Sequence, residues 1–305
     1  MPCPRFLLLG RNGQVGWELQ RALAPLGELV ALDRHGRDGL CGDLADPDGL
    51  AETVRRVNPD LIVNAAAYTA VDKAESEPEL ARRLNAAAPA VLAREAARSG
   101  AWLVHYSTDY VFDGSGAQPW NEDSPCAPLN VYGASKRDGE TAILASGAQA
   151  LIFRTSWVYA ARGQNFIRSM LRLAAERETL QVIDDQIGAP TAAELIADVT
   201  AQALRRVLLT PARERARFAG LYHLAAAGET SWCGYARFVL EQAAQRGMPL
   251  KAGPAQVEAI PSSAWPTAAR RPLNSRLATD RLRHVFGLHL PHWQTGVARM
   301  LDEIR

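Results

Sequence analysis

A turn with three glycines, Gly10-Arg-Asn-Gly13-Gln-Val-Gly16, restricts the fold of this chain more than any other feature. It follows the apolar run RFLLL directly and opens the helical pattern QVGWELQRALAPL. Glycine is needed where a strand must turn tightly into a helix and where the two must pack closely. A structural turn without a ligand is the alternative. Because a strand precedes it and a helix follows it, the turn predicts the first βαβ unit of a parallel sheet.

The same alternation continues through the first half of the chain. The apolar runs ELVALD, DLIVN, WLVHYS and ALIFR predict strands, while GLAETVRRV and ELARRLNAAAPAVLAREAARS have helical spacing. Pro89 is expected to kink or interrupt the last of these helices. Strands that are apolar on both faces are typical of a parallel sheet covered by helices on both sides. We therefore predict an α/β protein with a Rossmann-type, doubly wound parallel sheet and a smaller C-terminal α/β substrate domain.

The alternation becomes less regular beyond about residue 155. There QVIDDQIGAPT predicts a strand and loop, AAELIADVTAQALRRVLL an amphipathic helix, and LYHLAA another short strand. We expect a nucleotide-binding domain from residues 1–155 with about 185–220, and a substrate domain from 156–184 and 221–305.

Charge and composition favour neither nucleic acid nor membrane as a partner. The 305 residues include 34 basic and 33 acidic side chains, for a net charge of +1, and no apolar run approaches the length of a membrane span. The four cysteines are scattered, as expected for free thiols in a reducing compartment. We expect a cytoplasmic protein.

The glycine turn also predicts a dinucleotide site. Backbone N–H groups at a helix N-terminus can hold a diphosphate. The turn residues concerned are Gly10, Asn12, Gly13, Gln14, Val15 and Gly16. Asp33, which ends ELVALD, can bind the adenosine ribose and favours NAD, whereas Arg11 and Arg34 can hold a 2′-phosphate and favour NADP. Asp43 and its neighbour Leu44 can reach the adenine, although a helix N-cap is an equal alternative for Asp43.

Tyr132 and Lys136 are four residues apart in VYGASK, a spacing that puts both on one face of a helix. A free tyrosine has a pKa of about 10, and a nearby ammonium favours the phenolate, which lowers that pKa. A surface Tyr beside a solvated Lys is the alternative. After a dinucleotide turn and a strand that ends in Ser107-Thr108, the pair predicts an acid–base site.

Seven segments carry a resemblance to a known family across nearly the whole chain. They are GRNGQVGWEL, NAAAYTAVDKAE, HYSTDYVFDG, APLNVYGASK, FRTSWVY, DDQIGAPT and RRPLNSRL. The chain resembles extended short-chain dehydrogenases/reductases and, among them, the dTDP-4-dehydrorhamnose reductase family. The resemblance implies NADPH- or NADH-dependent reduction of the 4-keto group of dTDP-4-dehydro-β-L-rhamnose to dTDP-L-rhamnose, the last step of dTDP-rhamnose biosynthesis.

Two other functions stay open. One is another nucleotide-sugar reductase, epimerase or dehydratase of the extended type. A dehydratase would need additional carboxyls, but Thr108 is followed by Asp109 and Tyr110 rather than by an Asp-Glu pair. The other is a cofactor-binding regulatory subunit without turnover, against which the presence of Tyr132 and Lys136 argues.

The resemblance also implies roles for the site residues. Tyr132 would donate a proton to the developing alkoxide, and Lys136 would lower the Tyr132 pKa and hold the nicotinamide ribose. Thr108, rather than Ser107, would orient the ketone, and Asp109 would bind a sugar hydroxyl. The cofactor would further be lined by Ala67, Tyr68, Thr69 and Tyr106. The DKAE segment that follows can be an ordinary β–α turn.

Several other positions have an open alternative. Asn85 would lie near the nicotinamide, or hold a kinked helix ahead of Pro89. Trp157 would pack over the sugar or base, or fill the core. Asn165 would touch the diphosphate. Arg270, Arg271 and Arg276 form a local basic cluster, in which Arg271 would also bind the diphosphate. The alternative is that the cluster is a solvated basic loop.

Some members of the family bind Mg²⁺ between subunits through carboxylates. The matching positions here are Glu18, Glu194 and Glu303, whose oxygen ligands suit a hard cation. The resemblance therefore implies a homodimer with a shared metal, and the alternative is three helix-surface glutamates.

Overall fold

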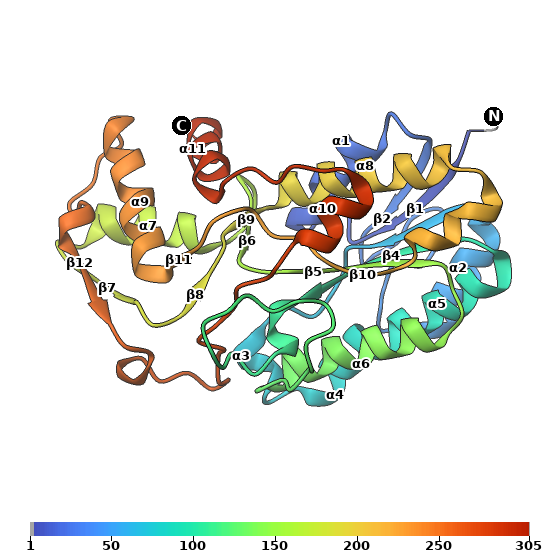
Figure 1. Cartoon of the computed structure of the whole chain (residues 1–305), viewed down its shortest axis with the longest axis horizontal. Helices are drawn as coiled ribbons and strands as arrows, with labels where there is room; N and C mark the ends of the chain where they lie inside the picture. The colour runs from blue at the N-terminus through green and yellow to red at the C-terminus, as the bar shows by residue number, and fades with distance from the viewer. Residues whose placement is uncertain (1–2, 305) are drawn as a thin grey trace.

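The structure, a computed structural model, describes residues 3–304 and is built around one parallel sheet (Figure 1). Six strands follow the order β10-β5-β4-β3-β1-β2, and all neighbouring pairs run parallel. The strands are β1 Arg5–Leu9, β2 Glu28–Leu32, β3 Leu61–Asn64, β4 Trp102–Thr108, β5 Ala150–Thr155 and β10 Gly220–His223. The predicted doubly wound Rossmann-type sheet is confirmed.

Helices cover both faces of the sheet because successive strand side chains point to opposite sides. Phe6 and Leu8 of β1 join one buried cluster, and Leu7 and Leu9 join the other. The first face is covered by α1 Gln14–Leu23, α8 Ala193–Leu209 and α10 Asp280–Phe286. The second is covered by α2 Pro47–Val57, α5 Ala88–Ser99 and α6 Val131–Ala145 (Figure 1).

The helix around Pro89 is interrupted as predicted. Helix α4, Pro78–Arg82, passes into a π-helical turn, Arg83–Ala87, before α5 begins. A wider turn accommodates a proline that has no N–H and whose ring would meet the carbonyl four residues earlier. Asn85 lies in this turn and is fully buried. Its Oδ1 accepts from Tyr68 N at 2.9 Å, and its Nδ2 donates to Tyr68 O and Ser135 Oγ, both at 3.0 Å. These bonds support the structural role for Asn85.

A second lobe lies to the left in Figure 1 and has two hydrophobic clusters of its own. Its helices are α7 Phe166–Glu176, α9 Trp232–Gln245 and α11 Trp293–Glu303. Its short strands pair as β7 Leu180–Ile183 with β12 Val257–Ile260, β8 Ile187–Gly188 with β11 Thr230–Ser231, and β6 Val158–Tyr159 with β9 Thr191–Ala192. Short helical segments, namely α3 Val71–Ala74 and the 3-10 turns Asp109–Val111, Ala212–Phe218, Pro254–Gln256 and Ser262–Ala264, complete the elements.

The chain returns to the sheet more extensively than expected. Strand β10 extends the sheet beyond β5, and Leu282 and Phe286 of α10 pack in the same core as α8. Strand β10 begins at Gly220, where we placed the boundary of the first domain, and α10 lies beyond that boundary. Strand β5 gains a partner on its open edge, and α10 covers apolar surface beside it, which explains why these segments join the sheet. The division into two functional domains stays a prediction.

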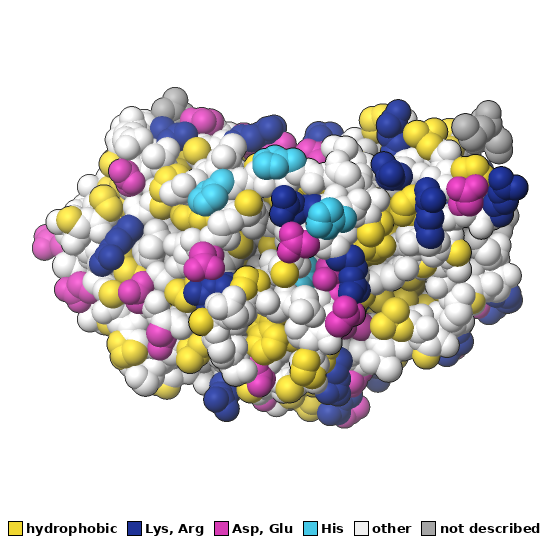
Figure 2. All heavy atoms as spheres, in the orientation of Figure 1, with side chains coloured by type: hydrophobic (Ala, Val, Ile, Leu, Met, Phe, Trp, Pro, Cys, Tyr) yellow, Lys and Arg dark blue, Asp and Glu magenta, His cyan; other side chains and the backbone are white. Residues whose placement is uncertain are grey.

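The surface carries mixed charge. On the face shown in Figure 2, basic and acidic side chains are interspersed, in keeping with the net charge of +1. Between residues 3 and 304, no helix combines the length and apolar character needed to cross a membrane.

Candidate active site

The glycine turn forms a cradle at the carboxyl end of β1. Gly10 has a φ of +87°, and a Cβ there would lie 2.7 Å from Ala66 N. A Cβ on Gly16 would lie 2.0 Å from Gly10 O, so α1 can approach the strand only without a side chain at that position. Because α1 begins at Gln14, the first N–H groups of this helix have no acceptor within it. The cradle fits a dinucleotide diphosphate, which would take those N–H groups as donors.

The acidic and basic signals for cofactor preference lie side by side at the end of β2. Asp33 Oδ2 accepts from Asn12 Nδ2, and Asp33 Oδ1 accepts from His35 N, both at 2.9 Å. The carboxylate is thereby oriented beside the glycine turn. Arg34 is exposed, and its Nε lies 3.4 Å from Asp43 Oδ2. The geometry therefore leaves room for either a ribose hydroxyl or a 2′-phosphate.

The N-cap alternative for Asp43 is wrong. Asp46 caps α2, because its Oδ1 accepts from Gly49 N at 2.9 Å. Asp43 Oδ1 instead accepts from Ala45 N at 2.9 Å and orders the preceding turn. Its neighbour Leu44 is buried in the second-face core.

The loop after β3 presents backbone and small side chains to the same edge. Ala67 and Thr69 are exposed, whereas Tyr68 is buried and its hydroxyl donates to Glu77 Oε2 at 2.7 Å. Tyr106 also points away from this edge, since its hydroxyl lies 2.8 Å from Thr200 Oγ1 on α8. The hydroxyl groups of Tyr68 and Tyr106 are thus hydrogen-bonded within the protein.

Helix α6 brings Tyr132 beside Thr108. Asn130 caps the helix, with its Oδ1 accepting from Gly133 N at 2.8 Å. Tyr132 lies close enough to Thr108 for the threonine hydroxyl to oppose the rise in the tyrosine's pKa, and Thr108 Oγ1 donates to Asp109 Oδ1 at 3.1 Å. Ser107 Oγ is buried and has no hydrogen-bond partner among residues 3–304. Of the two hydroxyls, Thr108 is the one that meets Tyr132.

The expected lowering of the Tyr132 pKa by Lys136 is not found. Burial raises the pKa of Tyr132 to about 12, although the hydrogen bond with Thr108 opposes this. The ammonium of Lys136 is directed elsewhere: Nζ donates to Tyr106 O at 2.6 Å and lies 3.3 Å from His105 Nε2. Burial lowers the pKa of Lys136 itself to about 8. Tyr132 is therefore protonated at neutral pH, as a proton donor must be before the reaction.

Asp109 is a buried carboxyl next to this pair. It is 2% exposed, and burial raises its pKa to about 6 against the opposing effect of Ser275 and Thr108. A carboxyl held this way can accept a hydrogen bond from a polar ligand group that replaces lost water.

A cavity of about 1500 Å³ is lined from both lobes, and Tyr110 connects it to the acid–base pair. Tyr110 lies on its wall and packs edge-on against Tyr132, with ring centroids 5.7 Å apart. On the other lobe, Trp232 lines the cavity and stacks on Trp157 with centroids 3.7 Å apart. Trp157 has a backbone φ of +47°, a conformation that residues other than glycine rarely adopt. No motif or spacing in the sequence pointed to Trp232 as a cavity residue.

Arg271 is ion-paired rather than free. Its guanidinium donates to Asp72 Oδ2 at 2.6 Å and Oδ1 at 3.1 Å. Arg276 pairs with Glu229 at 2.6 Å, while Arg270 is exposed at the cavity. The DKAE segment is thus more than a turn, because its Asp72 anchors the basic loop, a contact that sequence analysis missed.

Asn165 caps α7, and both polar atoms of its side chain form hydrogen bonds. Its Oδ1 accepts from Arg168 N at 3.3 Å, and its Nδ2 donates to Ala160 O at 2.7 Å and Gln14 Oε1 at 3.3 Å. The last bond ties the second lobe to the glycine turn. A contact between Asn165 and a diphosphate stays a prediction.

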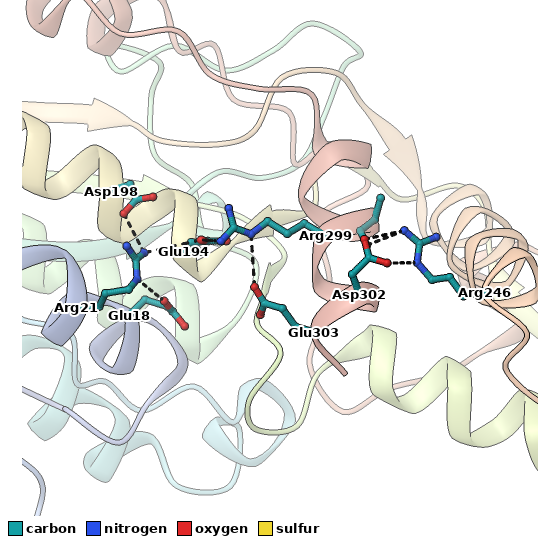
Figure 3. A network of polar contacts seen from close by, with 9 residues as sticks. Glu18, Arg21, Glu194, Asp198, Arg246, Arg299, Asp302 and Glu303 are labelled. Atoms are coloured by element: carbon teal, nitrogen blue, oxygen red, sulfur yellow. Dashed lines mark hydrogen bonds and ion pairs between the residues drawn. The ribbon is translucent and has the colours of Figure 1, made fainter. Parts of the chain in front are cut away.

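The three glutamates predicted to bind a metal lie on α1, α8 and α11, where arginines connect them (Figure 3). Arg299 contacts Glu194 at 2.6 Å and Glu303 at 3.5 Å, and Arg21 contacts Glu18 at 3.4 Å. In the part of the chain that the structure describes, no three potential ligands are grouped to hold a metal ion. Because the carboxylates face guanidinium groups, they do not form a metal site within one chain. A site shared between two subunits stays a prediction.

Comparisons with known proteins show the family of this chain. The sequence model of the family described as "RmlD substrate binding domain" matches residues 4–305. The chain is 57% identical to the dTDP-4-dehydrorhamnose reductase of Escherichia coli (strain K12), in an alignment that covers 98% of this chain and 97% of the relative. It is 49% identical to the dTDP-4-dehydrorhamnose reductase of Burkholderia thailandensis, with 98% of this chain and 99% of the relative covered. A crystal structure of the Bacillus anthracis reductase in complex with NADP superposes with a TM-score of 0.86 at 33% identity, covering 99% of each chain. The chain belongs to the dTDP-4-dehydrorhamnose reductase family.

Proposed function

We propose that this protein reduces the 4-keto group of dTDP-4-dehydro-β-L-rhamnose to dTDP-L-rhamnose with NADPH or NADH. The observation that carries the proposal is the pairing of Thr108 with Tyr132, one helical turn before the buried Lys136, in a sheet that also bears the glycine cradle. Membership of the reductase family gives the substrate, and the cavity that Tyr110 lines offers space for a nucleotide sugar.

Each residue of the site has a separate role in the reduction of the ketone. A bound dihydronicotinamide supplies the hydride to the carbonyl carbon. Thr108 donates a hydrogen bond to the ketone oxygen and orients it, and Tyr132 transfers its phenolic proton to that oxygen as negative charge develops. Hydride and proton together complete the new secondary alcohol. Lys136 binds the nicotinamide ribose, Asp109 binds a sugar hydroxyl, and Arg270 and Arg271 face the diphosphate.

The direct test is to incubate the protein with dTDP-4-dehydrorhamnose generated in situ and to follow the loss of reduced-nicotinamide absorbance with NADPH and with NADH. We expect oxidation of cofactor that depends on the sugar nucleotide, together with formation of dTDP-L-rhamnose. Cofactor binding without oxidation of either cofactor would favour a regulatory subunit. A changed sugar without net cofactor oxidation would favour an epimerase or dehydratase.

Thr108→Val should lower kcat/KM by about 10²–10³-fold, because it removes the hydrogen bond to the developing alkoxide without changing the volume of the side chain. Ser107→Ala is the matched control, since Ser107 Oγ is buried without a hydrogen-bond partner in residues 3–304. That control should change kcat/KM less than tenfold. Steady-state kinetics decide between them, and the reverse ranking would assign the role to Ser107.

Asp33→Ala should weaken NADH binding by about 10–100-fold, the worth of one or two hydrogen bonds to a charged group. NADPH binding should change much less, because its 2′-phosphate is repelled by the carboxylate that the substitution removes. Titration of both cofactors by calorimetry measures the two effects. Equal losses for NADH and NADPH would place the ribose away from Asp33.

A further inference from the structure

One loop of the second lobe reaches the glycine turn of the first. Residues 160–165 form this loop, which connects β6 with α7 (Figure 1). At its end, Asn165 Nδ2 donates to Gln14 Oε1 at 3.3 Å, and a Cβ on Gly163 would lie 3.5 Å from Cγ of Gln14. Gln14 begins α1, whose first N–H groups would hold the cofactor diphosphate. The loop therefore lies against the helix end at which the cofactor would bind.

Arg162, at the tip of this loop, stacks on an aromatic ring of α1. Its Cζ lies 3.8 Å from the centroid of the Trp17 ring. A guanidinium in this position is attracted to the electron-rich face of the indole. Trp17 is 43% exposed and Arg162 is also exposed, so the contact lies at the surface of the protein. It can therefore hold the loop against α1 and still open at a modest cost in free energy.

The stack on Trp17 is the contact that places the Arg162 side chain. Among residues 3–304, no carboxylate forms an ion pair with Arg162, and its guanidinium donates no hydrogen bond. Arg21, one turn after Trp17 on α1, instead pairs with Asp198 at 2.9 Å. Because no acid competes for the guanidinium of Arg162, its position depends on the ring of Trp17.

The base of the loop is fixed more firmly than its tip. Asn165 Nδ2 donates to Ala160 O at 2.7 Å, a bond that joins the last residue of the loop to the first. Residues 162–164 at the tip are all exposed, and Gly163 has a φ of +80°, which favours glycine at this turn. The tip can thus move on a fixed base, and Arg162 ties it to α1.

We propose that Arg162 is a positioning residue that holds the loop of residues 160–165 over the cofactor site by stacking on Trp17. The stack is a latch made of protein groups alone, so it acts both before and after the cofactor binds. It must open for the cofactor to enter and to leave. This rests on the proposed function and deepens it, because a closed loop keeps the diphosphate end of the cofactor in place during hydride transfer.

The first test measures the rates at which the cofactor binds and leaves. NADPH is mixed with the protein in a stopped-flow instrument, and bound NADPH is displaced by excess NADP⁺. The nicotinamide fluorescence is excited directly, so that the loss of a tryptophan does not change the signal. In Arg162→Ala and in Trp17→Leu, we expect the association and dissociation rate constants both to rise about 3–10-fold, the effect of one exposed cation–π contact. The dissociation constant should change less than about threefold.

Combined and conservative variants show whether the two residues act together. If the stack is the latch, Arg162→Ala combined with Trp17→Leu should exchange cofactor no faster than either change alone. Arg162→Lys keeps a cation and Trp17→Phe keeps a ring, so both should restore most of the slow exchange. Arg172→Ala is the matched control, because it removes an exposed charge from α7, and we expect it to leave the rates unchanged.

The second test needs neither cofactor nor substrate. Trypsin can cleave after Arg162 when the loop opens from α1, and mass spectrometry identifies the fragments. Cleavage there should be about 3–10-fold faster in Trp17→Leu than in the unmodified protein, and close to normal in Trp17→Phe. Cleavage after Arg213, an exposed arginine in the 3-10 turn that follows α8, is the internal control and should not change.

The outcomes separate the latch from other roles of Arg162 and from the proposed function. Non-additive acceleration of cofactor exchange, with faster cleavage after Arg162, supports the latch. A weaker affinity in Arg162→Ala that persists in the Trp17→Leu background would show a direct contact with the cofactor, and unchanged rates would show that the stack has no influence; both results overturn the proposal. If a Trp17 variant does not fold, the rates of Arg162→Ala and Arg162→Lys still decide. Absence of reductase activity would defeat the proposed function while leaving the exchange rates and the cleavage interpretable.

Discussion

Tyr132→Phe should lower kcat by about 10²–10⁴-fold while the cofactor still binds. The substitution removes only the phenolic hydroxyl, whose pKa of about 12 keeps it protonated and ready to donate at neutral pH. The ring, and its edge-on contact with Tyr110, can stay in place. Steady-state kinetics with saturating cofactor measure the loss, and a cofactor titration shows that the site remains formed.

Tyr110→Phe is the matched control for this variant. Tyr110 is a neighbouring, half-buried tyrosine whose ring lines the cavity, but its hydroxyl is associated with Arg271 rather than with Thr108. We expect its removal to change kcat less than tenfold and to act mainly on KM. Near-normal turnover in Tyr132→Phe, or an equal loss in kcat for both variants, would contradict the assignment of Tyr132 as the proton donor.

Glu140→Gln should lower the free energy of unfolding by about 3–5 kcal/mol, because it leaves the charge of Arg154 buried without its partner. The pair is deeply enclosed, with both side chains 4% exposed and joined by bonds of 2.9 and 2.7 Å. Denaturant unfolding measures the loss. The control is Glu176→Gln, which breaks an exposed pair with Arg172 and should change stability by less than about 1 kcal/mol.

A double variant separates the two contributions to that loss. Arg154→Met combined with Glu140→Gln removes the stranded charge and should recover part of the lost stability, since a well-packed apolar group can replace a buried ion pair. Equal stability of Glu140→Gln and the unmodified protein would mean that Arg154 reaches solvent or another partner. Because Glu140 also favours the ammonium of Lys136, activity is measured in parallel.

The fold was predictable because its signals are local. The strands β1 to β5 are short apolar runs, and the glycine turn, the interruption ahead of Pro89 and the spacing of Tyr132 and Lys136 each follow from a few neighbouring residues. The end of the first lobe was harder to predict. Strand β10 and helix α10 carry no local mark that tells them which sheet or core they join. That choice depends on which surfaces other segments leave uncovered.

The same distinction between local signals and distant contacts holds for the site. The residue types that carry the chemistry were predictable from local patterns, because each stands at a fixed distance from the end of a strand or the start of a helix. They are the glycine cradle, Asp33, Thr108, Tyr132 and Lys136. Contacts between distant segments could not be read this way, as for Asp72 with Arg271 and Trp157 with Trp232.

The charge state of the acid–base pair depends on contacts that form only when the chain folds. The spacing of Tyr132 and Lys136 predicted a lowered pKa for the tyrosine, but burial raises it, and Nζ of the lysine is bound by Tyr106 O and His105 instead. Spacing fixes which side chains share a helical face. Proton affinity depends on burial and on the donors and acceptors that other strands bring to the same point, and those exist only once the chain has folded.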